Sequence, residues 1–195
     1  MELRKQFGEP ERRLHLSNTP TLRYKEPSEK LKRRWASVKK PSGLWYGFDT
    51  SWMEWSASEY ACMLRPFIHE VIFKDESRIL KVTTLEEFDA FEKRYWAKDA
   101  MFRELQELFP TIPTLEAFLP SYDLSYNRLI GSIDWPEVMQ SYAACEINPY
   151  LYKRRLESAW YYGWDCASGC VWDGTAIEFK PFAVYDENKK VFVRV

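Results

Sequence analysis

The sequence predicts an α+β fold, in which helices flank a split antiparallel β-sheet core. Short apolar and aromatic runs bounded by turn residues are typical of strands, and long stretches of chain separate them. Amphipathic segments that begin with capping residues indicate helices between these strands. The chain has 195 residues, 46% of them hydrophobic, which is enough for one core. We therefore expect a single domain over residues 1–195, with a basic N-terminal segment over about 1–40.

The strands are predicted from polar–apolar alternation and from aromatic runs next to glycine or turn residues. The segments at 69–74 and 78–82 are expected to pair with each other through the turn at Asp75-Glu76-Ser77. The full set of predicted strands is 13–17, 43–48, 69–74, 78–82, 143–147, 175–182 and 182–195.

The helices are predicted from their start signals. Thr84 and Glu87 form a capping-box pattern, and Asp134 precedes Pro136 at a typical helix start. The region from Gly163 to Gly174 is rich in glycine and tryptophan and is expected to be a loop. The predicted helices are 28–35, 51–62, 84–95, 101–108, a turn at 114–118, 134–142 and a short basic helix or turn at 151–157.

Charge is distributed unevenly along the chain, although the formal net charge is only −1. Residues 1–40 carry twelve Lys/Arg and five Asp/Glu, a net +7, so the remainder carries −8. A basic arm on an acidic body favours either an anionic partner for the arm or a solvated leader. No apolar run approaches 18 residues and charged residues follow Met1, so we expect no membrane partner and a cytoplasmic location.

Four cysteines and two histidines supply few metal ligands, and no Cys-x-x-Cys pair is present. Cys166 and Cys170 are separated by three residues, which is a weak metal signal. We expect reduced, buried thiols and no metal site.

Glu146 is the residue most suggestive of chemistry. It lies in an apolar and aromatic stretch just before Asn148-Pro149, so a strand must end there in a turn. Burying a carboxylate is costly unless it is paired or used. One interpretation is a glutamate paired with an arginine, and the other is a catalytic acid in a cleft.

Other polar and aromatic residues stand at the ends of the predicted early strands. Leu14-His15-Leu16-Ser17 forms the first, and Gly43-Leu44-Trp45-Tyr46 forms the second, followed by a helix from Ser51. With Glu146 on a late strand, this order resembles the ADP-ribosyltransferase superfamily, in particular small bacterial or phage-type members with a histidine, an aromatic residue and a glutamate on successive motifs. The resemblance implies an ADP-ribosyltransferase-like fold.

The resemblance also implies NAD as the substrate and toxin-like activity as a mono-ADP-ribosyltransferase, a type of glycosyl transfer. Glu146 would stabilise the ribose cation formed when nicotinamide leaves. Trp45 or Tyr46 would stack on nicotinamide, and strand alternation allows only one of them to face the cleft, with Tyr46 preferred. His15 would bind a ribose hydroxyl. The same motifs place Ser17 near the nicotinamide amide, Gly43 at the cofactor-binding strand and Arg13 near the pyrophosphate.

The acceptor of such a transfer is expected to be a macromolecule, either a protein or a nucleic acid. Many protein-modifying relatives carry Glu or Gln two residues before the catalytic acid, where this chain has Ala144. Arginine is therefore not the expected acceptor. An inhibitor or antitoxin partner is compatible with this interpretation. Hydrolysis of NAD without an acceptor, and a non-enzymatic binding or inhibitor module with an aromatic surface against a host protein, are the alternatives.

Overall fold

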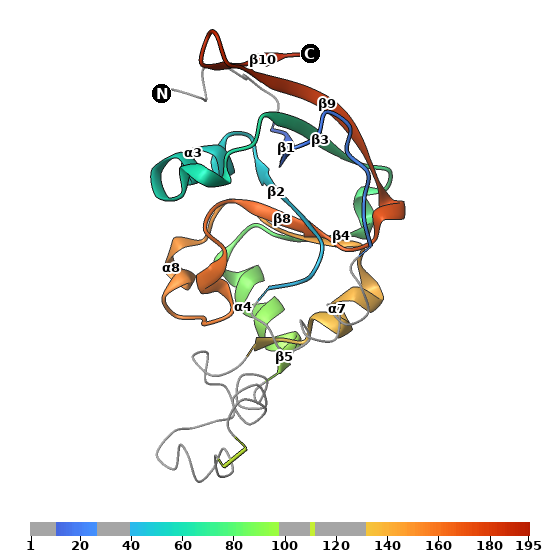
Figure 1. Cartoon of the computed structure of the whole chain (residues 1–195). Coiled ribbons are helices and arrows are strands. Elements are labelled where there is room, and N and C mark those ends of the chain that lie inside the picture. Colours follow the sequence, from blue (N-terminus) through green and yellow to red (C-terminus); the bar gives the residue numbers. More distant parts are fainter. Residues whose placement is uncertain (1–10, 27–39, 98–109, 112–131) are drawn as a thin grey trace.

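The computed structural model describes residues 11–26, 40–97, 110–111 and 132–195. Within these residues the fold is α+β, with one eight-stranded mixed sheet and four α-helices (Figure 1). The strand order across the sheet is β10-β9-β3-β1-β2-β8-β7-β4. The strands are β1 Arg13–Ser17, β2 Leu44–Phe48, β3 Phe67–Phe73, β4 Ile79–Val82, β7 Ala144–Ile147, β8 Ser168–Val171, β9 Ile177–Asp186 and β10 Val191–Arg194, with a separate pair of β5 Trp96–Ala97 and β6 Ser132–Ile133.

The helices begin where the sequence predicts them. Thr84 and Glu87 form the expected capping box of α4 (Leu85–Arg94). Asp134 accepts a hydrogen bond from the Glu137 backbone at the start of α7, which carries a proline in its first turn. The other two α-helices are α3 (Ser51–Glu59) and α8 (Tyr152–Arg155). The helix predicted at 51–62 is therefore shorter, because a separate 3₁₀ turn covers Ala61–Met63.

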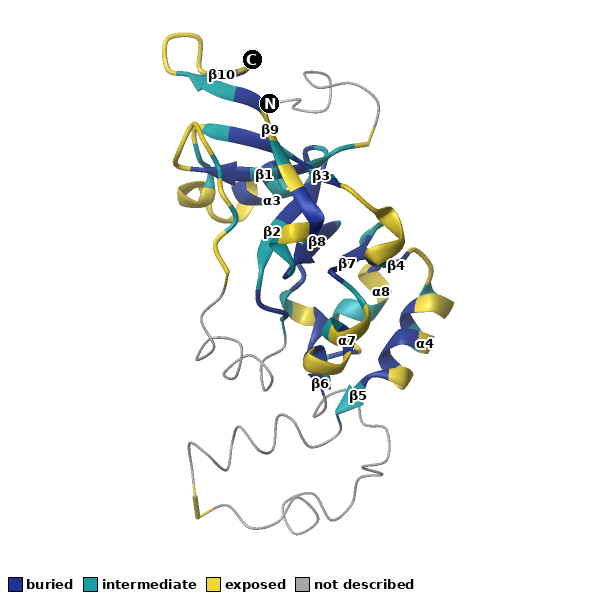
Figure 2. Cartoon of the chain, turned by 90° about the vertical axis from the view of Figure 1, so that its right-hand side faces the viewer, coloured by how far each residue is buried: buried dark blue, intermediate teal, exposed yellow. Residues whose placement is uncertain are grey.

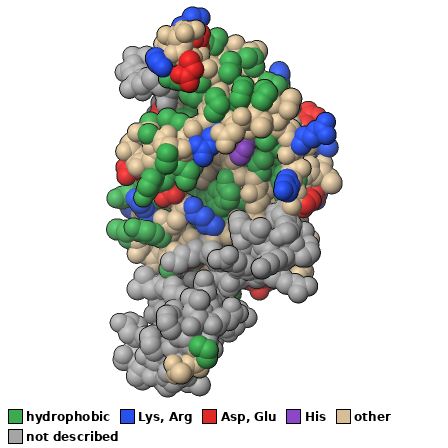
Figure 3. All heavy atoms as spheres, in the orientation of Figure 1, with side chains coloured by type: hydrophobic (Ala, Val, Ile, Leu, Met, Phe, Trp, Pro, Cys, Tyr) green, Lys and Arg blue, Asp and Glu red, His purple; other side chains and the backbone are tan. Residues whose placement is uncertain are grey.

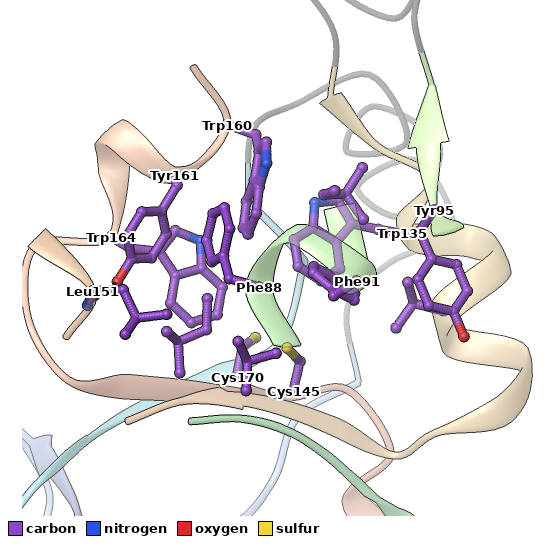
Figure 4. Packing of buried hydrophobic residues seen from close by; sticks show 14 of the residues in the cluster. Phe88, Phe91, Tyr95, Trp135, Cys145, Leu151, Trp160, Tyr161, Trp164 and Cys170 are labelled. Carbon is purple, nitrogen blue, oxygen red and sulfur yellow. Dashed lines mark hydrogen bonds between the residues drawn. The ribbon is translucent and has the colours of Figure 1, made fainter. Parts of the chain in front are cut away.

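One face of the sheet packs against a cluster of aromatic rings (Figure 4). Phe88 of α4 is fully buried and stacks on Trp160 with 5.1 Å between ring centroids. Cys145 and Cys170 close the cluster from the sheet side. Aromatic side chains bury a large area each, so this cluster supplies much of the core at that end of the sheet. A second cluster on β2, β3 and β9 includes Tyr46 and Phe73, and Figure 2 shows the buried strands running through the middle of the molecule.

Two predictions about the sheet are wrong. The segments at 69–74 and 78–82 are strands, but they do not pair with each other: β3 pairs with β1 and β9, and β4 runs parallel to β7. The sheet is therefore mixed and not wholly antiparallel. Strand β7 is paired on both edges, with β8 on one side and β4 on the other, and the 3₁₀ turn Glu76–Arg78 directly precedes β4.

The segment predicted as a loop at 163–174 contains strand β8, which lies between β2 and β7. Its sequence, Ser-Gly-Cys-Val, has few of the β-branched or aromatic residues by which strands are recognised. The two terminal strands were expected around a turn at Asp186-Glu187-Asn188, and β9 and β10 do flank that turn, although β9 continues past the expected boundary at Phe182 to Asp186. The helices expected at 28–35 and 101–108 and the turn at 114–118 lie outside the described residues.

Helices of membrane-spanning length and hydropathy do not occur in the described part of the chain.

Replacing Phe88 with alanine should lower the free energy of unfolding by about 3–5 kcal/mol, because the cavity lies in a fully buried aromatic cluster. Urea denaturation of the variant and the wild type measures the change. Glu86→Ala, on the exposed side of the same helix, is the control and should stay within about 0.5 kcal/mol of the wild type. Equal effects of the two substitutions would contradict the packing described for α4.

Candidate functional site

Glu146 lies in the interior of the sheet and is only 4% exposed. The register places it opposite Gly169 of β8, which in turn lies opposite Tyr46 of β2. Residues in register on neighbouring strands point to the same face of the sheet. The Tyr46 hydroxyl therefore reaches across β8 and donates a 2.8 Å hydrogen bond to Oε1 of Glu146.

Gly169 makes this contact possible. A Cβ atom at position 169 would lie 2.6 Å from both Cζ and the hydroxyl oxygen of Tyr46, far inside van der Waals contact. The ring of Tyr46 thus occupies the space that a side chain on β8 would fill. The absence of a side chain on the central strand is what joins Tyr46 to Glu146.

Arg13 supplies the positive charge for Glu146. Its Nε donates to Oε1 of Glu146 at 2.5 Å, while its two terminal nitrogens donate to Glu76 at 2.7 and 2.8 Å. Lys81 donates to the same Glu76 at 2.6 Å, and the Arg13 guanidinium lies 5.1 Å from the centre of the Phe73 ring. The expectation that a buried glutamate is paired with an arginine is confirmed.

The ion pair changes the proton affinities of its members. Burial opposes the charge of Arg13, but its hydrogen bonds to Glu146 and Glu76 prevail and raise the pKa of the guanidinium. Burial, followed by the neighbouring charge of Glu146, raises the pKa of Tyr46 well above its ordinary value. Tyr46 is therefore a neutral hydrogen-bond donor, and Arg13 is a permanent cation.

A pocket of about 350 Å³ opens where β1 and β2 separate. The two strands pair only at Arg13 with Phe48 and at Leu14 with Gly47. Beyond that point His15 from β1 and both Trp45 and Tyr46 from β2 line the pocket. Figure 3 shows hydrophobic side chains around a hollow on this side of the molecule, with a histidine and basic side chains nearby. The volume lies in the range of small-molecule sites.

His15 has a defined hydrogen-bonding role in this pocket. Its Nδ1 lies 2.7 Å from the carbonyl oxygen of Trp45, which can only accept, so Nδ1 carries the proton. Burial lowers the pKa of His15, and the bond to the Trp45 carbonyl opposes that shift. The ring is therefore neutral at pH 7, and Nε2 is an acceptor.

Lys40 and Asp165 belong to the same pocket and were not identified from the sequence. Lys40 Nζ lies 3.8 Å from Asp165 and 5.1 Å from the centre of the Trp45 ring. Burial lowers the pKa of Lys40 and raises that of Asp165, and their mutual attraction opposes both shifts. Groups in a cleft whose pKa values are shifted by burial and by a specific charge partner are candidates for a functional site. The other described residues that line the pocket are Leu14, Leu16, Trp52, Met63, Arg65, Trp164 and Ser168.

Glu146 does not line this pocket among the described residues. It lines a separate hollow of about 160 Å³ with Glu11, Arg13, Phe48, Lys81, Val82, Thr83 and Asn148. Tyr46 connects the two, because it lines the larger pocket and its hydroxyl binds Glu146. The structure thus brings together His15, Trp45 and Tyr46, and it links Glu146 to them through Tyr46.

The remaining predicted site residues have local roles. Ser17 Oγ lies 3.1 Å from the Thr19 hydroxyl and accepts a bond from the Thr19 backbone. At Gly43 a Cβ atom would lie 2.1 Å from the Val171 carbonyl, so this glycine permits the close approach of β8. Arg13 is committed to Glu146 and Glu76, as described above. Within the described segments, no group of three or more ligating side chains could hold a metal ion.

Comparisons with protein-family models, curated proteins and solved structures find no match for this chain.

Replacing Arg13 with methionine should lower the free energy of unfolding by about 3 kcal/mol, because it leaves the buried Glu146 carboxylate without a cation. Adding Glu146→Gln should recover part of this loss, since no charge then remains unpaired. Urea denaturation of both single variants and the double variant gives the coupling energy. Strictly additive losses would contradict the pairing.

Protonation of His15 should destabilise the fold as the pH falls. Its folded-state pKa lies below the ordinary 6.5, so between that lower pKa and 6.5 the unfolded chain binds more protons and stability decreases with decreasing pH. Between about pH 7.5 and 5.5 the melting temperature should therefore fall more in the wild type than in His15→Asn, which keeps a donor for Trp45. Equal slopes would contradict the assignment, and NMR titration of His15 gives its pKa directly.

Proposed function

We propose that this protein is an NAD-dependent mono-ADP-ribosyltransferase that acts on a macromolecular acceptor. The observation that supports the proposal is the position of Tyr46, which lines the pocket between β1 and β2 and binds Glu146 through its hydroxyl. Tyr46 thereby links His15 and Trp45, which line the same pocket, to Glu146, which lines a separate hollow. The resemblance to the ADP-ribosyltransferases implies that these same residues share one cofactor site.

In the proposed site, the aromatic wall of the pocket accepts the flat rings of NAD. Trp45 and Tyr46 both line the pocket, which differs from the expectation that only one of them faces it. His15 Nε2 accepts a hydrogen bond from a ribose hydroxyl, because Nδ1 is committed to Trp45. Arg65 and Lys40 supply positive charge at the pocket for the pyrophosphate.

The proposed reaction breaks the glycosidic bond between ribose C1′ and the nicotinamide nitrogen. The bonding electrons leave with nicotinamide, whose ring becomes neutral, and positive charge develops on the ribose. The carboxylate of Glu146 stabilises this charge. A nucleophile of the acceptor then forms the new bond to C1′ and releases its proton.

For this role the bonds of Glu146 must change. Its carboxylate now receives hydrogen bonds from Arg13 and Tyr46, and the guanidinium offsets its negative charge. Glu76 holds the two terminal nitrogens of Arg13 and is itself half exposed. Arg13 can therefore keep Glu76 as its partner when Glu146 turns to the ribose, and the released charge of Glu146 becomes available.

The acceptor in this proposal is not arginine. Ala144, which stands where many protein-modifying relatives carry Glu or Gln, is fully buried and cannot contact an acceptor. A protein or a nucleic acid is the remaining choice.

A second candidate function is a binding or inhibitor module. Three large apolar side chains near α8 are more than half exposed: Tyr152 by 66%, Leu156 by 70% and Tyr162 by 54%. Exposed tyrosines beside arginine are common at protein interfaces, and Arg155 lies 5.3 Å from the centre of the Tyr162 ring. This surface favours a protein partner and requires no chemistry at Glu146.

Incubation with labelled NAD and a cell lysate tests the first proposal. Wild type should consume NAD and label a macromolecule, whereas Glu146→Gln should lose at least about a hundredfold in rate, because it removes the charge that stabilises the ribose cation. Free ADP-ribose in buffer alone would indicate hydrolysis without an acceptor.

Circular dichroism controls for folding of the Glu146→Gln variant in this experiment. No NAD consumption by a folded wild type would overturn the proposal, and equal rates in both proteins would remove Glu146 from the reaction. Capture of a single protein from the lysate, equal for wild type and Glu146→Gln, would favour the binding module.

A further inference from the structure

The larger pocket contains a carboxylate that the resemblance does not account for. Asp165 lines it, and its side chain is only 20% exposed. We infer that Asp165 is a ribose-binding residue, and that the pocket takes a ribonucleoside whose hydroxyls donate hydrogen bonds to it. The inference deepens the proposed function by naming what this pocket recognises, but it depends on binding and not on turnover of NAD.

Glu146 and Asp165 differ in the hydrogen bonds that they accept, and this difference indicates different roles. Oε1 of Glu146 accepts from Arg13 Nε at 2.5 Å and from Tyr46 at 2.8 Å, and Oε2 accepts a longer bond of 3.4 Å from Arg13 Nη2. The nearest cation to Asp165 is Lys40 Nζ at 3.8 Å, which is longer than a direct hydrogen bond. Among the described residues, Asp165 accepts no bond at ordinary hydrogen-bond distance.

Asp165 is only partly buried and has Lys40 at ion-pair distance, so its carboxylate keeps the capacity to accept further hydrogen bonds from a ligand. A carboxylate in a cleft is also a candidate functional group when its surroundings perturb its pKa, as burial does for Asp165. Its four lone pairs can accept two hydrogen bonds side by side, which suits neighbouring hydroxyls on one sugar ring. An acidic residue that holds ribose hydroxyls is a recurrent solution in nucleotide sites.

The walls of the pocket favour a flat aromatic base next to that sugar. Trp45 and Trp164 meet edge to face with 4.9 Å between ring centroids, and both line the pocket with Trp52. Trp45 and Trp52 are partly exposed and can stack on any planar base, whereas Trp164 is only 1% exposed and supports Trp45 from the core. Lys40 lies beside both Trp45 and Asp165, where an ammonium would meet a 5′-phosphate.

His15, on β1, supplies a second hydrogen-bond acceptor to the pocket. Its Nε2 is an acceptor, as argued above from the bond between Nδ1 and Trp45. The pocket therefore offers two acceptors, one imidazole nitrogen and one carboxylate, and both require hydroxyl or amino donors on the ligand. A ribonucleoside provides these donors, and a nucleoside without the 2′ and 3′ hydroxyls does not.

Isothermal titration of the full chain with adenosine, nicotinamide riboside and 2′,3′-dideoxyadenosine tests the inference. At least one ribonucleoside should bind, and the better of the two identifies which half of NAD the pocket takes. Asp165→Asn should weaken that binding by about tenfold to a hundredfold, the loss expected for hydrogen bonds to a charged group. If adenosine is the better ligand, dideoxyadenosine should bind wild type about as weakly as adenosine binds the variant.

Glu157→Gln is the matched control, since it removes an exposed acid that does not line the pocket, and it should leave the affinity within about twofold. Circular dichroism and melting temperatures show whether Asp165→Asn is folded. Equal affinity in wild type and folded Asp165→Asn, equal affinity for ribo- and dideoxynucleosides, or no binding by any nucleoside overturns the inference.

The nucleoside titration and the NAD consumption assay together distinguish this inference from the proposed function. Nucleoside binding that depends on Asp165, in a protein that never consumes NAD, leaves the inference standing and removes the transferase. If the protein consumes NAD but Asp165→Asn leaves the nucleoside affinity unchanged, only the inference about Asp165 is overturned.

Discussion

The structure depends on the side chains that neutralise and hydrogen-bond one buried carboxylate, Glu146, at the centre of the sheet. Glu146 on β7 binds Tyr46 on β2 and Arg13 on β1, so one side chain joins three strands of the sheet. Arg13 continues the network to Glu76, in the turn that directs β4 back to β7. An isolated charge at this depth would cost several kcal/mol, and the network removes that cost only when all of these strands are in place. The ion pair thus favours this strand order over others.

The hydrogen-bond network of Glu146 also depends on Gly169, which has no side chain. Gly169 leaves the space through which Tyr46 reaches Glu146, and it can do so only because β8 lies between β2 and β7. Tyr46 is then held on one side by Glu146 while its own strand borders the larger pocket. The geometry of that pocket and the burial of Glu146 are therefore coupled through one phenol ring and one glycine.

The sequence predicts the parts of this fold that have local causes. The capping box at Thr84 and the helix start at Asp134 depend on residues a few positions apart, and both are present. Strand β8 was missed because its small residues give no local signal and only its position between two other strands makes it a strand. The parallel pairing of β4 with β7 also has no local signal in the sequence, because it joins segments about 65 residues apart. For the site, His15 and Tyr46 were marked by strand motifs, whereas Lys40 and Asp165 lie outside any periodic pattern and meet only in the folded chain.

The two carboxylates of the site show why burial alone does not assign a role. Glu146 is the more deeply buried, yet its charge is already offset by a guanidinium at hydrogen-bond distance, which reduces the field that it can exert on a ribose cation. Asp165 is less buried, and its nearest cation among the described residues, Lys40, stands 3.8 Å away. If both act on one nucleotide, they must do so differently: Asp165 can bind a sugar with no rearrangement, while Glu146 acts only after Arg13 withdraws to Glu76. In the proposed reaction Arg13 would then control the chemistry, because a bound substrate would have to interact with Glu146 more favourably than the guanidinium does.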